Sequence, residues 1–278
     1  MRGAFLAGLA ALLVTPALAE GERIVSVGGS LTEIIYALGA GDRVIARDTT
    51  SSYPAEVADL PNVGYIRNVA AEGVLSVNPD MIIAEHDLGP KETVALLEAA
   101  EIPLIIIPES PTAQGLADKI NAVGLALGEE EKAAAMAADA QARVEAAFEK
   151  ATSHGQAPKR VMFILSLQNG RAFASGADTT ADAMIKLAGG INALGSFTGY
   201  KPLNSEAISQ AKPDAILMIS RDNNHGASNE ELFAVPGMTL TPAFDTGSVI
   251  RMDGLYLLGF GPRTPDAIED LADALYGG

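Results

Sequence analysis

Cysteine is absent from the 278 residues of this sequence. The fold can therefore contain neither disulfide bonds nor thiolate metal sites. The same absence excludes the class of exported proteins that is anchored through a lipid on cysteine. Tryptophan is missing as well, and aromatic residues make up only 5% of the chain, so intrinsic fluorescence will be weak.

Patterns typical of enzyme active sites are missing too. No Ser/His/Asp order and no close pair of carboxylates stands out, and the three histidines are not spaced as a metal site. We therefore expect that the protein is not an enzyme.

Basic residues are scarce. Lysine and arginine number 19 against 35 aspartates and glutamates, which gives a formal net charge of −16. A protein this acidic is poorly suited to binding nucleic acid or an anionic lipid surface. An anionic ligand would need basic groups that are gathered at its own site.

Long hydrophobic runs are also absent. No uncharged apolar stretch reaches the ~20 residues that a membrane-spanning helix needs. A shorter apolar run, Ala4 to Val14, follows Arg2 and precedes Pro16 and Ala17-Leu18-Ala19. This order is typical of a cleavable signal peptide. We expect residues 1–19 to be removed on export, which leaves a soluble protein in the periplasm of a two-membrane bacterium.

Short strands alternate with helices in the rest of the chain. Residues 24–27 form an apolar strand, and Gly28-Gly29-Ser30 leads into a helix at 31–38, for which Ser30 and Glu33 are predicted to form a capping box. Such alternation favours parallel sheets that are covered on both faces. Further apolar strands are predicted at 44–46, 81–84, 104–107, 161–165, 215–219 and 249–252.

One stretch has the strongest helix propensity in the chain. Residues 129–151 contain no proline or glycine and are rich in alanine. At 1.5 Å per residue, such a helix extends roughly 33 Å, which is long enough to connect two lobes. We therefore divide the chain into an N-terminal lobe at 20–128, a linking helix at 129–154 and a C-terminal lobe at 155–278. His154 at the end of this helix is interpreted as structural.

A short internal repeat indicates that the two halves are alike. Residues 71–83 align with residues 205–217, because in each a glutamate opens a short helix and Pro-Asp follows seven residues later, directly before a strand. The predicted fold is therefore α/β, with two lobes built on central parallel sheets, one long α-helix that joins them, and a ligand cleft between the lobes.

Two segments resemble a known family. Val63-Gly64-Tyr65-Ile66-Arg67, followed by residues 71–76, resembles the haem-ligand segment of the periplasmic haem-binding proteins of bacterial haem ABC importers. Residues 253–263, Asp-Gly-Leu-Tyr-Leu-Leu-Gly-Phe-Gly-Pro-Arg, resemble the C-terminal signature of the same proteins. They belong to a larger class that binds vitamin B12, iron siderophores or haem, and the likeness covers essentially the whole chain after the signal peptide.

The resemblance implies that Tyr65 supplies an axial phenolate to haem iron. Phenolate is a hard oxygen donor that suits Fe³⁺ and is a known axial ligand of haem. Tyrosine titrates near ~10 in water, and both ligation and a neighbouring cation favour its charged form. Arg67 is expected to be that cation if the loop turns both side chains to one side. The alternative, from the residues alone, is that Tyr65 packs on a loop and Arg67 is a solvated charge.

The far side of the cleft departs from some members of this family. Several of them have a histidine in the turn after the first strand of the second lobe, whereas this turn reads Ser166-Leu167-Gln168-Asn169-Gly170. An amide cannot replace imidazole as an ordinary haem ligand. We therefore expect five-coordinate haem, or water as the sixth ligand, with Gln168 and Asn169 reaching the ligand only through hydrogen bonds.

The second half of the chain supplies further candidates. The internal repeat turns Tyr200 toward the cleft, where it would stack on the porphyrin or donate a hydrogen bond, unless it only packs within its lobe. Arg221 follows a strand at the edge where open α/β sheets bind ligands, and it is expected to pair with a propionate or with the phenolate. Lys201 is a weaker candidate of the same kind. His86 and His225 follow equivalent strands and are expected near the mouth of the cleft.

Glu72 and Glu206 occupy matching places in the repeat. Each begins a helix, where a negative charge contributes ~0.3–1 kcal/mol by its interaction with the helix dipole. In the family that the chain resembles, matching glutamates lie at the outer tips of the two lobes and pair with arginines of the membrane permease. The structural and the docking roles are compatible, and we expect both.

These features predict a monomeric protein that captures haem b with ferric iron and delivers it to the permease of an ABC importer. The single stiff connecting helix predicts that the lobes move only modestly on binding. Two alternatives stay open: a binder of the same fold for a ferric siderophore or a cobalamin, and a metal- or haem-dependent enzyme.

Overall fold

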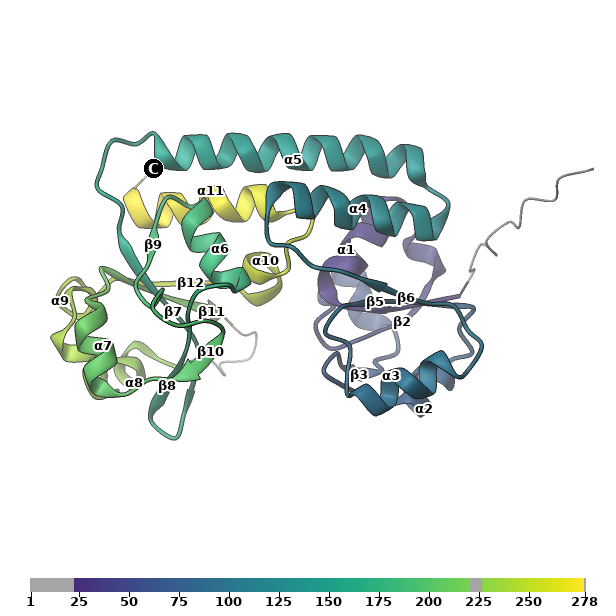
Figure 1. The fold of residues 1–278 in the computed structure, drawn as a ribbon, viewed down its shortest axis with the longest axis horizontal. Coiled ribbons are helices and arrows are strands. Elements are labelled where there is room, and N and C mark those ends of the chain that lie inside the picture. The colour runs from purple at the N-terminus through teal and green to yellow at the C-terminus, as the bar shows by residue number, and fades with distance from the viewer. Residues whose placement is uncertain (1–22, 221–226, 278) are drawn as a thin grey trace, which may run out of the picture.

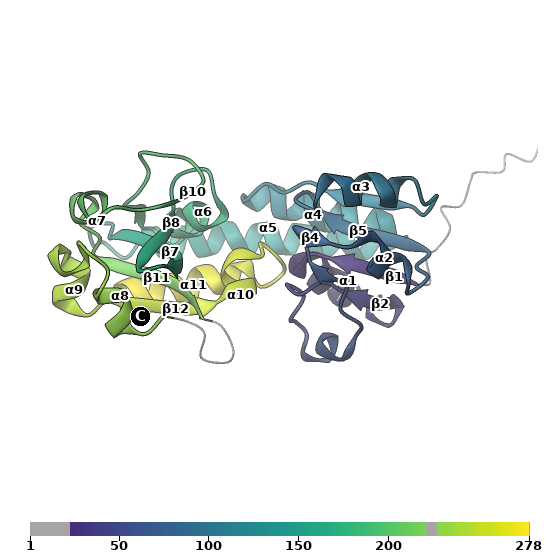
Figure 2. The ribbon, with the colours of Figure 1, turned by 90° about the horizontal axis from the view of Figure 1, so that it is seen from below.

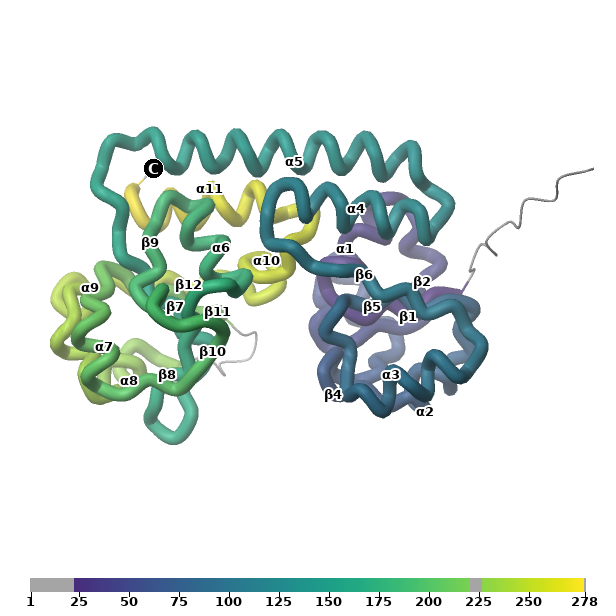
Figure 3. The backbone as a smooth tube through the Cα atoms, viewed as in Figure 1, coloured from purple at the N-terminus to yellow at the C-terminus, as the bar shows by residue number. Residues whose placement is uncertain are grey.

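A computed structural model describes residues 23–220 and 227–277 of the chain. Figure 1 shows two α/β lobes that lie side by side beneath one long helix, α5 (Glu130–Thr152). The chain builds the first lobe, runs along α5 and then builds the second lobe (Figure 3). Seen from below, α5 passes behind both lobes (Figure 2). The predicted α/β architecture of two lobes joined by one long helix is therefore confirmed.

The N-terminal lobe is built on a four-stranded parallel sheet in the order β2-β1-β5-β6. All four residues of β1 are buried, as expected for a parallel sheet that is covered on both faces. Helices α1 and α4 lie on one side of this sheet, and α2 and α3 lie on the other (Figure 1). The bounds are β1 Ile24–Val27, β2 Val44–Arg47, β5 Met81–Glu85, β6 Leu104–Ile107, α1 Gly29–Ala37, α2 Ala71–Leu75, α3 Lys91–Glu98 and α4 Ala113–Leu127, with 3-10 turns at Gly41–Arg43 and Ala55–Asp59.

Two loops of this lobe meet at one edge of the sheet. β1 and β5 are neighbours whose last paired residues are Val27 and Ala84, so the residues that follow each strand lie close together. A small hairpin of β3 (Gly64–Tyr65) and β4 (Asn68–Val69) is bonded to the loop after β5, because Gly89 N donates to the carbonyl oxygen of Ile66 at 2.9 Å.

The sheet of the C-terminal lobe is mixed, which corrects the prediction of a parallel sheet. β7, β9, β11 and β12 are connected by parallel pairing, but β8 pairs antiparallel with both β7 and β10. The reason is the pair Asn169-Gly170, whose φ angles of 51° and 72° form a tight turn between β7 and β8. Asn-Gly is a strong hairpin signal, which the prediction treated only as the turn after a parallel strand.

The remaining elements of this lobe surround its sheet (Figure 1). Their bounds, together with those of the strands, are β7 Arg160–Gln168, β8 Arg171–Ser175, β9 Ile191–Asn192, β10 Tyr200–Pro202, β11 Ala215–Ser220, β12 Val249–Asp253, α6 Thr180–Leu187, α7 Ser205–Ala211, α8 Asn229–Phe233, α9 Pro242–Thr246, α10 Gly254–Leu258 and α11 Thr264–Tyr276, with a 3-10 turn at Met238–Leu240.

A stripe of small residues holds α5 against α4 and α11. The approach is close at Gly124 of α4, where an added Cβ would lie 2.1 Å from Cβ of Ala133. An ion pair of 2.7 Å between Arg143 and Asp266 also joins α5 to α11. The buried residues of α5 are Ala133, Ala137, Ala140, Val144, Ala147 and Ala151.

Within residues 23–220 and 227–277, no helix combines the length and the apolar character needed to cross a membrane.

The segment after β12 packs against the first lobe. Lys119 of α4 donates from Nζ to the carbonyl oxygens of Gly259 and Phe260, each at 3.2 Å. Arg263 forms an ion pair with Glu33 of α1. These contacts join the two lobes independently of α5.

The predicted capping box at the start of α1 is wrong. The N-cap residue is Gly28, and no side chain caps this helix end. Ser30 instead donates from Oγ to Glu85 Oε1 at 2.6 Å, while Glu33 pairs with Arg263. Both side chains are taken by partners distant in sequence, which local spacing cannot reveal.

Candidate functional site

A cleft of about 1200 Å³ lies between the two lobes. The first lobe contributes most of its ionisable side chains, from the β3–β4 hairpin and from the loops that follow β5 and β6. The second half of the chain contributes most of its large apolar side chains, which are Leu165, Phe173, Tyr200, Ile219, Leu255 and Leu258.

Tyr65 and Arg67 lie together on the wall of the first lobe. The Tyr65 side chain is 43% exposed and lines the cleft. Arg67 donates from Nη1 to the Tyr65 hydroxyl, and its Nη2 forms an ion pair with Asp87. Burial lowers the pKa of the Arg67 guanidinium, but the neighbouring Asp87 and Tyr65 outweigh this effect and raise it. A permanent cation therefore stands against the phenol oxygen.

A cluster of polar side chains lies in the same wall of the cleft as Tyr65 and Arg67. Ser30, Glu85 and Glu109 line the cleft, and the buried Lys119 donates from Nζ to Ser30 Oγ at 3.0 Å. Glu109 Oε1 lies 3.8 Å from the same Nζ. Burial raises the pKa of Glu85 to about 7, although Lys119 and the hydrogen bond from Ser30 oppose the shift. The cleft thus contains a carboxyl group that changes its charge near neutral pH.

The glycine at the end of β1 makes room for this carboxyl group. Gly28 has a φ of 126°, and an added Cβ would lie 2.6 Å from Cγ and Cδ of Glu85. Only glycine combines that backbone conformation with such a close approach. The Gly-Gly-Ser turn therefore positions Glu85 in the cleft as well as starting α1.

Tyr200 faces the cleft from the second lobe, but its environment is different. Its ring stacks on Phe173 with centroids 6.2 Å apart and meets Phe163 edge-on at 6.5 Å. Burial raises the pKa of Tyr200, although the nearby hydroxyls of Ser175 and Thr179 and the positive charge of Arg67 oppose the shift. Tyr200 is therefore a neutral phenol that presents an aromatic ring to the cleft.

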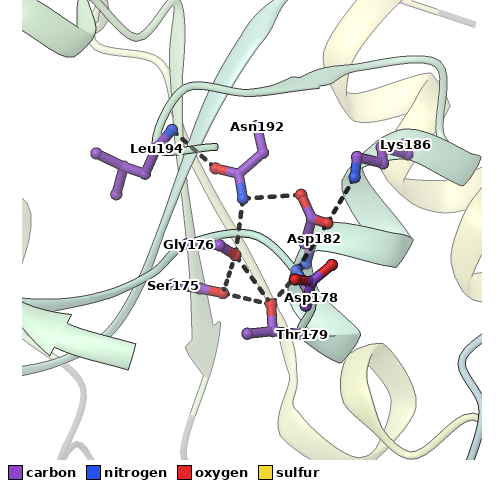
Figure 4. Close-up of polar contacts among 8 residues, drawn as sticks. All are labelled: Ser175, Gly176, Asp178, Thr179, Asp182, Lys186, Asn192 and Leu194. Atoms are coloured by element: carbon purple, nitrogen blue, oxygen red, sulfur yellow. Dashed lines mark hydrogen bonds and ion pairs between the residues drawn. The ribbon is translucent and has the colours of Figure 1, made fainter. Parts of the chain in front are cut away.

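The loop behind Tyr200 is held by a buried polar network (Figure 4). Thr179 caps α6 by accepting from the backbone N of Asp182 at 3.0 Å. The Asp182 carboxylate accepts from Asn192 Nδ2 at 3.0 Å and from Lys186 at 2.7 Å. Asn192 also donates to the carbonyl oxygen of Gly176 at 3.0 Å. This network fixes the loop that follows Ser175, the residue that pairs with Tyr200 across β8 and β10.

Three other predicted residues lie away from the cleft lining. Gln168 and Asn169 are at the end of the β7–β8 hairpin, where Gln168 donates to Ser166 Oγ at 3.2 Å. Lys201 is exposed, and its Nζ lies 3.8 Å from the centre of the Phe197 ring. None of the three is among the residues that line the cleft. Arg221 and His225 lie outside the described residues.

Among the histidines, His86 lines the cleft, and its Nδ1 lies 3.8 Å from Glu109 Oε2. His154 stacks on Tyr276 with ring centroids 3.7 Å apart, which agrees with its structural interpretation. Within the parts of the chain that are described, no three histidine or acidic side chains are arranged to hold a bare metal ion.

Glu72 and Glu206 are both exposed in the first turns of α2 and α7. These helices lie at the ends of the two lobes that point away from α5 (Figure 1). Glu206 also accepts a hydrogen bond of 2.9 Å from Gln210, one turn later. The two carboxylates therefore project from corresponding positions on the two lobes.

The sequence interpretation missed several residues of the cleft. Glu85 is the last residue of β5 and Asp87 lies two residues beyond it, at the carboxyl edge of a parallel sheet where ligand sites are expected. That rule was applied to Arg221 in the second lobe and would also have found these two. Lys119 is not among the lining residues but donates to Ser30, and it carries no comparable signal, because it looks like an ordinary polar residue of α4.

The chain is similar to a protein family and to several known proteins. The model of the periplasmic binding protein family matches residues 24–255. The solved structure of a periplasmic haem-binding protein, RhuT from Roseiflexus sp. RS-1 in apo form, is similar with a TM-score of 0.87 and 38% identity, over 91% of this chain and 97% of that chain. The uncharacterised ABC transporter substrate-binding lipoprotein YvrC of Bacillus subtilis is 28% identical over 92% of this chain and 81% of its own length. A vitamin B12-binding protein of Pectobacterium atrosepticum is 27% identical over 98% of this chain and 94% of its own length.

Proposed function

This chain belongs to the periplasmic binding protein family, whose members serve ABC importers as substrate-binding proteins, and we propose that its substrate is ferric haem. Haem b enters the cleft between the lobes, Tyr65 binds its iron as a phenolate, and the loaded protein delivers it to an ABC permease. The haem is cargo, and the chain itself carries out no reaction on it.

The observation that carries this proposal is the pair formed by Tyr65 and Arg67. Tyr65 is a half-exposed phenol on the cleft wall, and a guanidinium donates to its oxygen. Phenolate is an established axial ligand of haem iron and matches the hardness of Fe³⁺.

The two walls also suit a flat ligand with one reactive face. A phenolate from the first lobe would bind the iron from one side, while Phe173, Leu165 and Ile219 of the second lobe would contact the other side of the macrocycle. The cleft, at about 1200 Å³, exceeds the ~300–1,000 Å³ of ordinary small-molecule sites, which favours a large ligand. Because Tyr200 is a neutral phenol stacked on Phe173 and Gln168 lies outside the lining, we propose five-coordinate haem or water as the sixth ligand.

Delivery is proposed to depend on the outer tips of the lobes. Glu72 and Glu206 project from corresponding helices on the side away from α5, so that a permease with matching cationic sites would contact both at once. We further propose that residues 1–19 direct export to the periplasm and that the protein acts there as a monomer.

Ferric haem added to the purified protein, followed by visible absorbance, tests the proposal. We expect a phenolate-to-iron charge-transfer band at saturation, which disappears in Tyr65→Ala. Tyr53→Ala is the matched control, because Tyr53 is equally exposed but is not part of the cleft lining. A wild-type spectrum without the band, or an unchanged band in Tyr65→Ala, would reject Tyr65 as the ligand.

A cobalamin is the second candidate, because a relative that is 27% identical is a vitamin B12-binding protein. The same protein titrated with cobalamin and with a ferric siderophore separates the possibilities. Saturation by haem at micromolar concentration, with no response to the other two, supports the proposal. Saturation by cobalamin alone would replace it.

A further inference from the structure

Asp87 lies two residues beyond β5 and contacts the guanidinium that holds Tyr65. We infer that Asp87 is a positioning residue, which holds Arg67 against the Tyr65 oxygen and thereby sets how strongly that oxygen binds iron. Because this role presupposes that Tyr65 binds haem iron, it rests on the proposed function.

Arg67 has a long side chain that is 60% exposed on a small hairpin. Such a side chain loses considerable rotamer freedom when it is fixed, and one hydrogen bond to a phenol is weak compensation. The guanidinium is a rigid planar fork. Its Nη2 is held by the Asp87 carboxylate, and this fixes the direction in which Nη1 points to the Tyr65 hydroxyl.

Asp87 lies on a loop that is fixed by burial and by backbone hydrogen bonds. Its side chain is only 21% exposed, and the next residue, Leu88, is buried. The loop is tied to the hairpin by two backbone hydrogen bonds of 2.9 Å, from Gly89 N to the Ile66 oxygen and from Val69 N to the Gly89 oxygen. Asp87 is therefore a fixed point from which Arg67 can be oriented.

Asp87 is poorly placed for a role in stability alone. Its Oδ1 is buried, and among the described residues no donor reaches it. A buried carboxylate oxygen without a partner is destabilising. Among the described residues, the ion pair with Arg67 offsets this penalty. Through Arg67, the Asp87 carboxylate is connected to the Tyr65 site.

The hydrogen bond from Arg67 also changes how strongly the Tyr65 oxygen would bind iron. A hydrogen bond donated to a ligating oxygen draws electron density from it and weakens its bond to the metal. Phenolate that accepts a bond from Arg67 is thus a weaker donor to Fe³⁺ than free phenolate, which raises the reduction potential of the haem. By holding Arg67 in place, Asp87 keeps the haem bond weak enough for release.

The test compares Arg67→Ala, Asp87→Ala, Asp87→Asn and the double variant Arg67→Ala/Asp87→Ala as haem complexes. The readouts are the wavelength of the phenolate charge-transfer band and the reduction potential from spectroelectrochemistry. We expect Asp87→Ala to lower the potential by at least about half of the shift that Arg67→Ala causes. Asp87→Asn should shift it less, because an amide oxygen still accepts from Arg67. The double variant should equal Arg67→Ala alone, since contacting residues that act through one bond are not additive.

Asp80→Ala is the matched control, because it removes an exposed aspartate at the opposite end of β5 and should leave both readouts unchanged. A wild-type potential in Asp87→Ala, or shifts that add in the double variant, would overturn the role. A rise in potential would overturn it too, because it would mean that Arg67 stays on Tyr65 without Asp87. A wild type without a phenolate band would reject the proposed function itself, and the role of Asp87 with it.

Discussion

The tyrosines that precede the two copies of the internal repeat are held in different ways. Tyr65 is 43% exposed and accepts a hydrogen bond from the cation Arg67. Tyr200 is stacked on Phe173, and burial raises its pKa although two nearby hydroxyls and Arg67 oppose the shift. Removal of a phenol from water favours its neutral form. Similar segments therefore give one residue suited to binding a metal and one suited to stacking.

The same contrast extends to the walls of the cleft. Ionisable groups such as Glu85, Asp87 and Glu109 come from the first lobe, while Leu165, Phe173 and other large apolar side chains come from the second. A ligand bound between them would face Tyr65 and ionisable groups on one side and apolar side chains on the other. The composition of both walls, and not only the position of Tyr65, therefore favours ligation from the first lobe alone.

Removing one oxygen atom from each tyrosine tests the contrast directly. Tyr65→Phe should abolish the charge-transfer band and weaken ferric haem binding on the order of 100-fold, about 2.7 kcal/mol. Tyr200→Phe keeps the ring that faces the ligand and should change affinity less than about threefold. Absorbance titrations of both variants, side by side, provide the measurement. Equal losses in the two would mean that both tyrosines are ligands.

Glu85 gives the first-lobe wall a pH dependence of its own. Its pKa rises from 4.5 to about 7 in the folded protein, so the folded state binds this proton more tightly than the unfolded state. Its contribution to stability is therefore complete below pH 4.5 and is lost as the pH rises toward and through 7, by up to about 1.4 kcal/mol per pH unit.

Glu85→Gln should remove this slope. We expect the variant to exceed the wild type in free energy of unfolding by about 3 kcal/mol at pH 8 and to differ little at pH 4.5. Urea unfolding of the ligand-free protein at several pH values measures the difference. Glu145→Gln, on the exposed side of α5, is the control and should follow the wild type throughout. Parallel pH profiles for Glu85→Gln and wild type would contradict the assignment.

The glutamates of the two repeats should contribute equally to docking at the permease, although the tyrosines before them differ in how they face the ligand. Glu72→Gln and Glu206→Gln should each lower haem uptake about tenfold, which corresponds to about 1.4 kcal/mol, in vesicles with the reconstituted permease. Haem affinity should stay at the wild-type value, because both side chains are exposed on α2 and α7. Glu98→Gln on the exposed end of α3 is the control. Unequal effects of the two variants would show that docking is one-sided as well.

Much of the fold was predictable because it depends on local pattern. The apolar strands, the alternation with helices and the proline-free stretch that becomes α5 all gave the two-lobe architecture correctly. The mixed sheet of the second lobe was missed because Asn169-Gly170 was not treated as a hairpin turn. The capping box failed for another reason: Ser30 and Glu33 fit the local rule, but partners from distant segments use both side chains.

The candidate site was predictable only in part. Tyr65, Arg67 and Tyr200 were named from the sequence, and all three line the cleft. Asp87 and Lys119 were not named, because their partners come from a different loop and from the other lobe. Such pairs are set by tertiary packing and leave no spacing signal in the chain.

Substitution of Gln168 should have the smallest effect on haem binding. This is the position from which the second lobe would supply a sixth ligand if both walls of the cleft bound the iron. Gln168 ends β7 and donates to Ser166, away from the cleft lining. Gln168→Ala should therefore change haem affinity less than about twofold, within the range of surface substitutions. Gln168→His is the sharper variant, because imidazole is a strong ligand of haem iron. If the hairpin stays outside the cleft, its haem spectrum will remain that of the wild type. A six-coordinate low-spin spectrum would show that the lobes close far enough to bring β7–β8 to the iron, and that α5 permits more movement than a single stiff connector should.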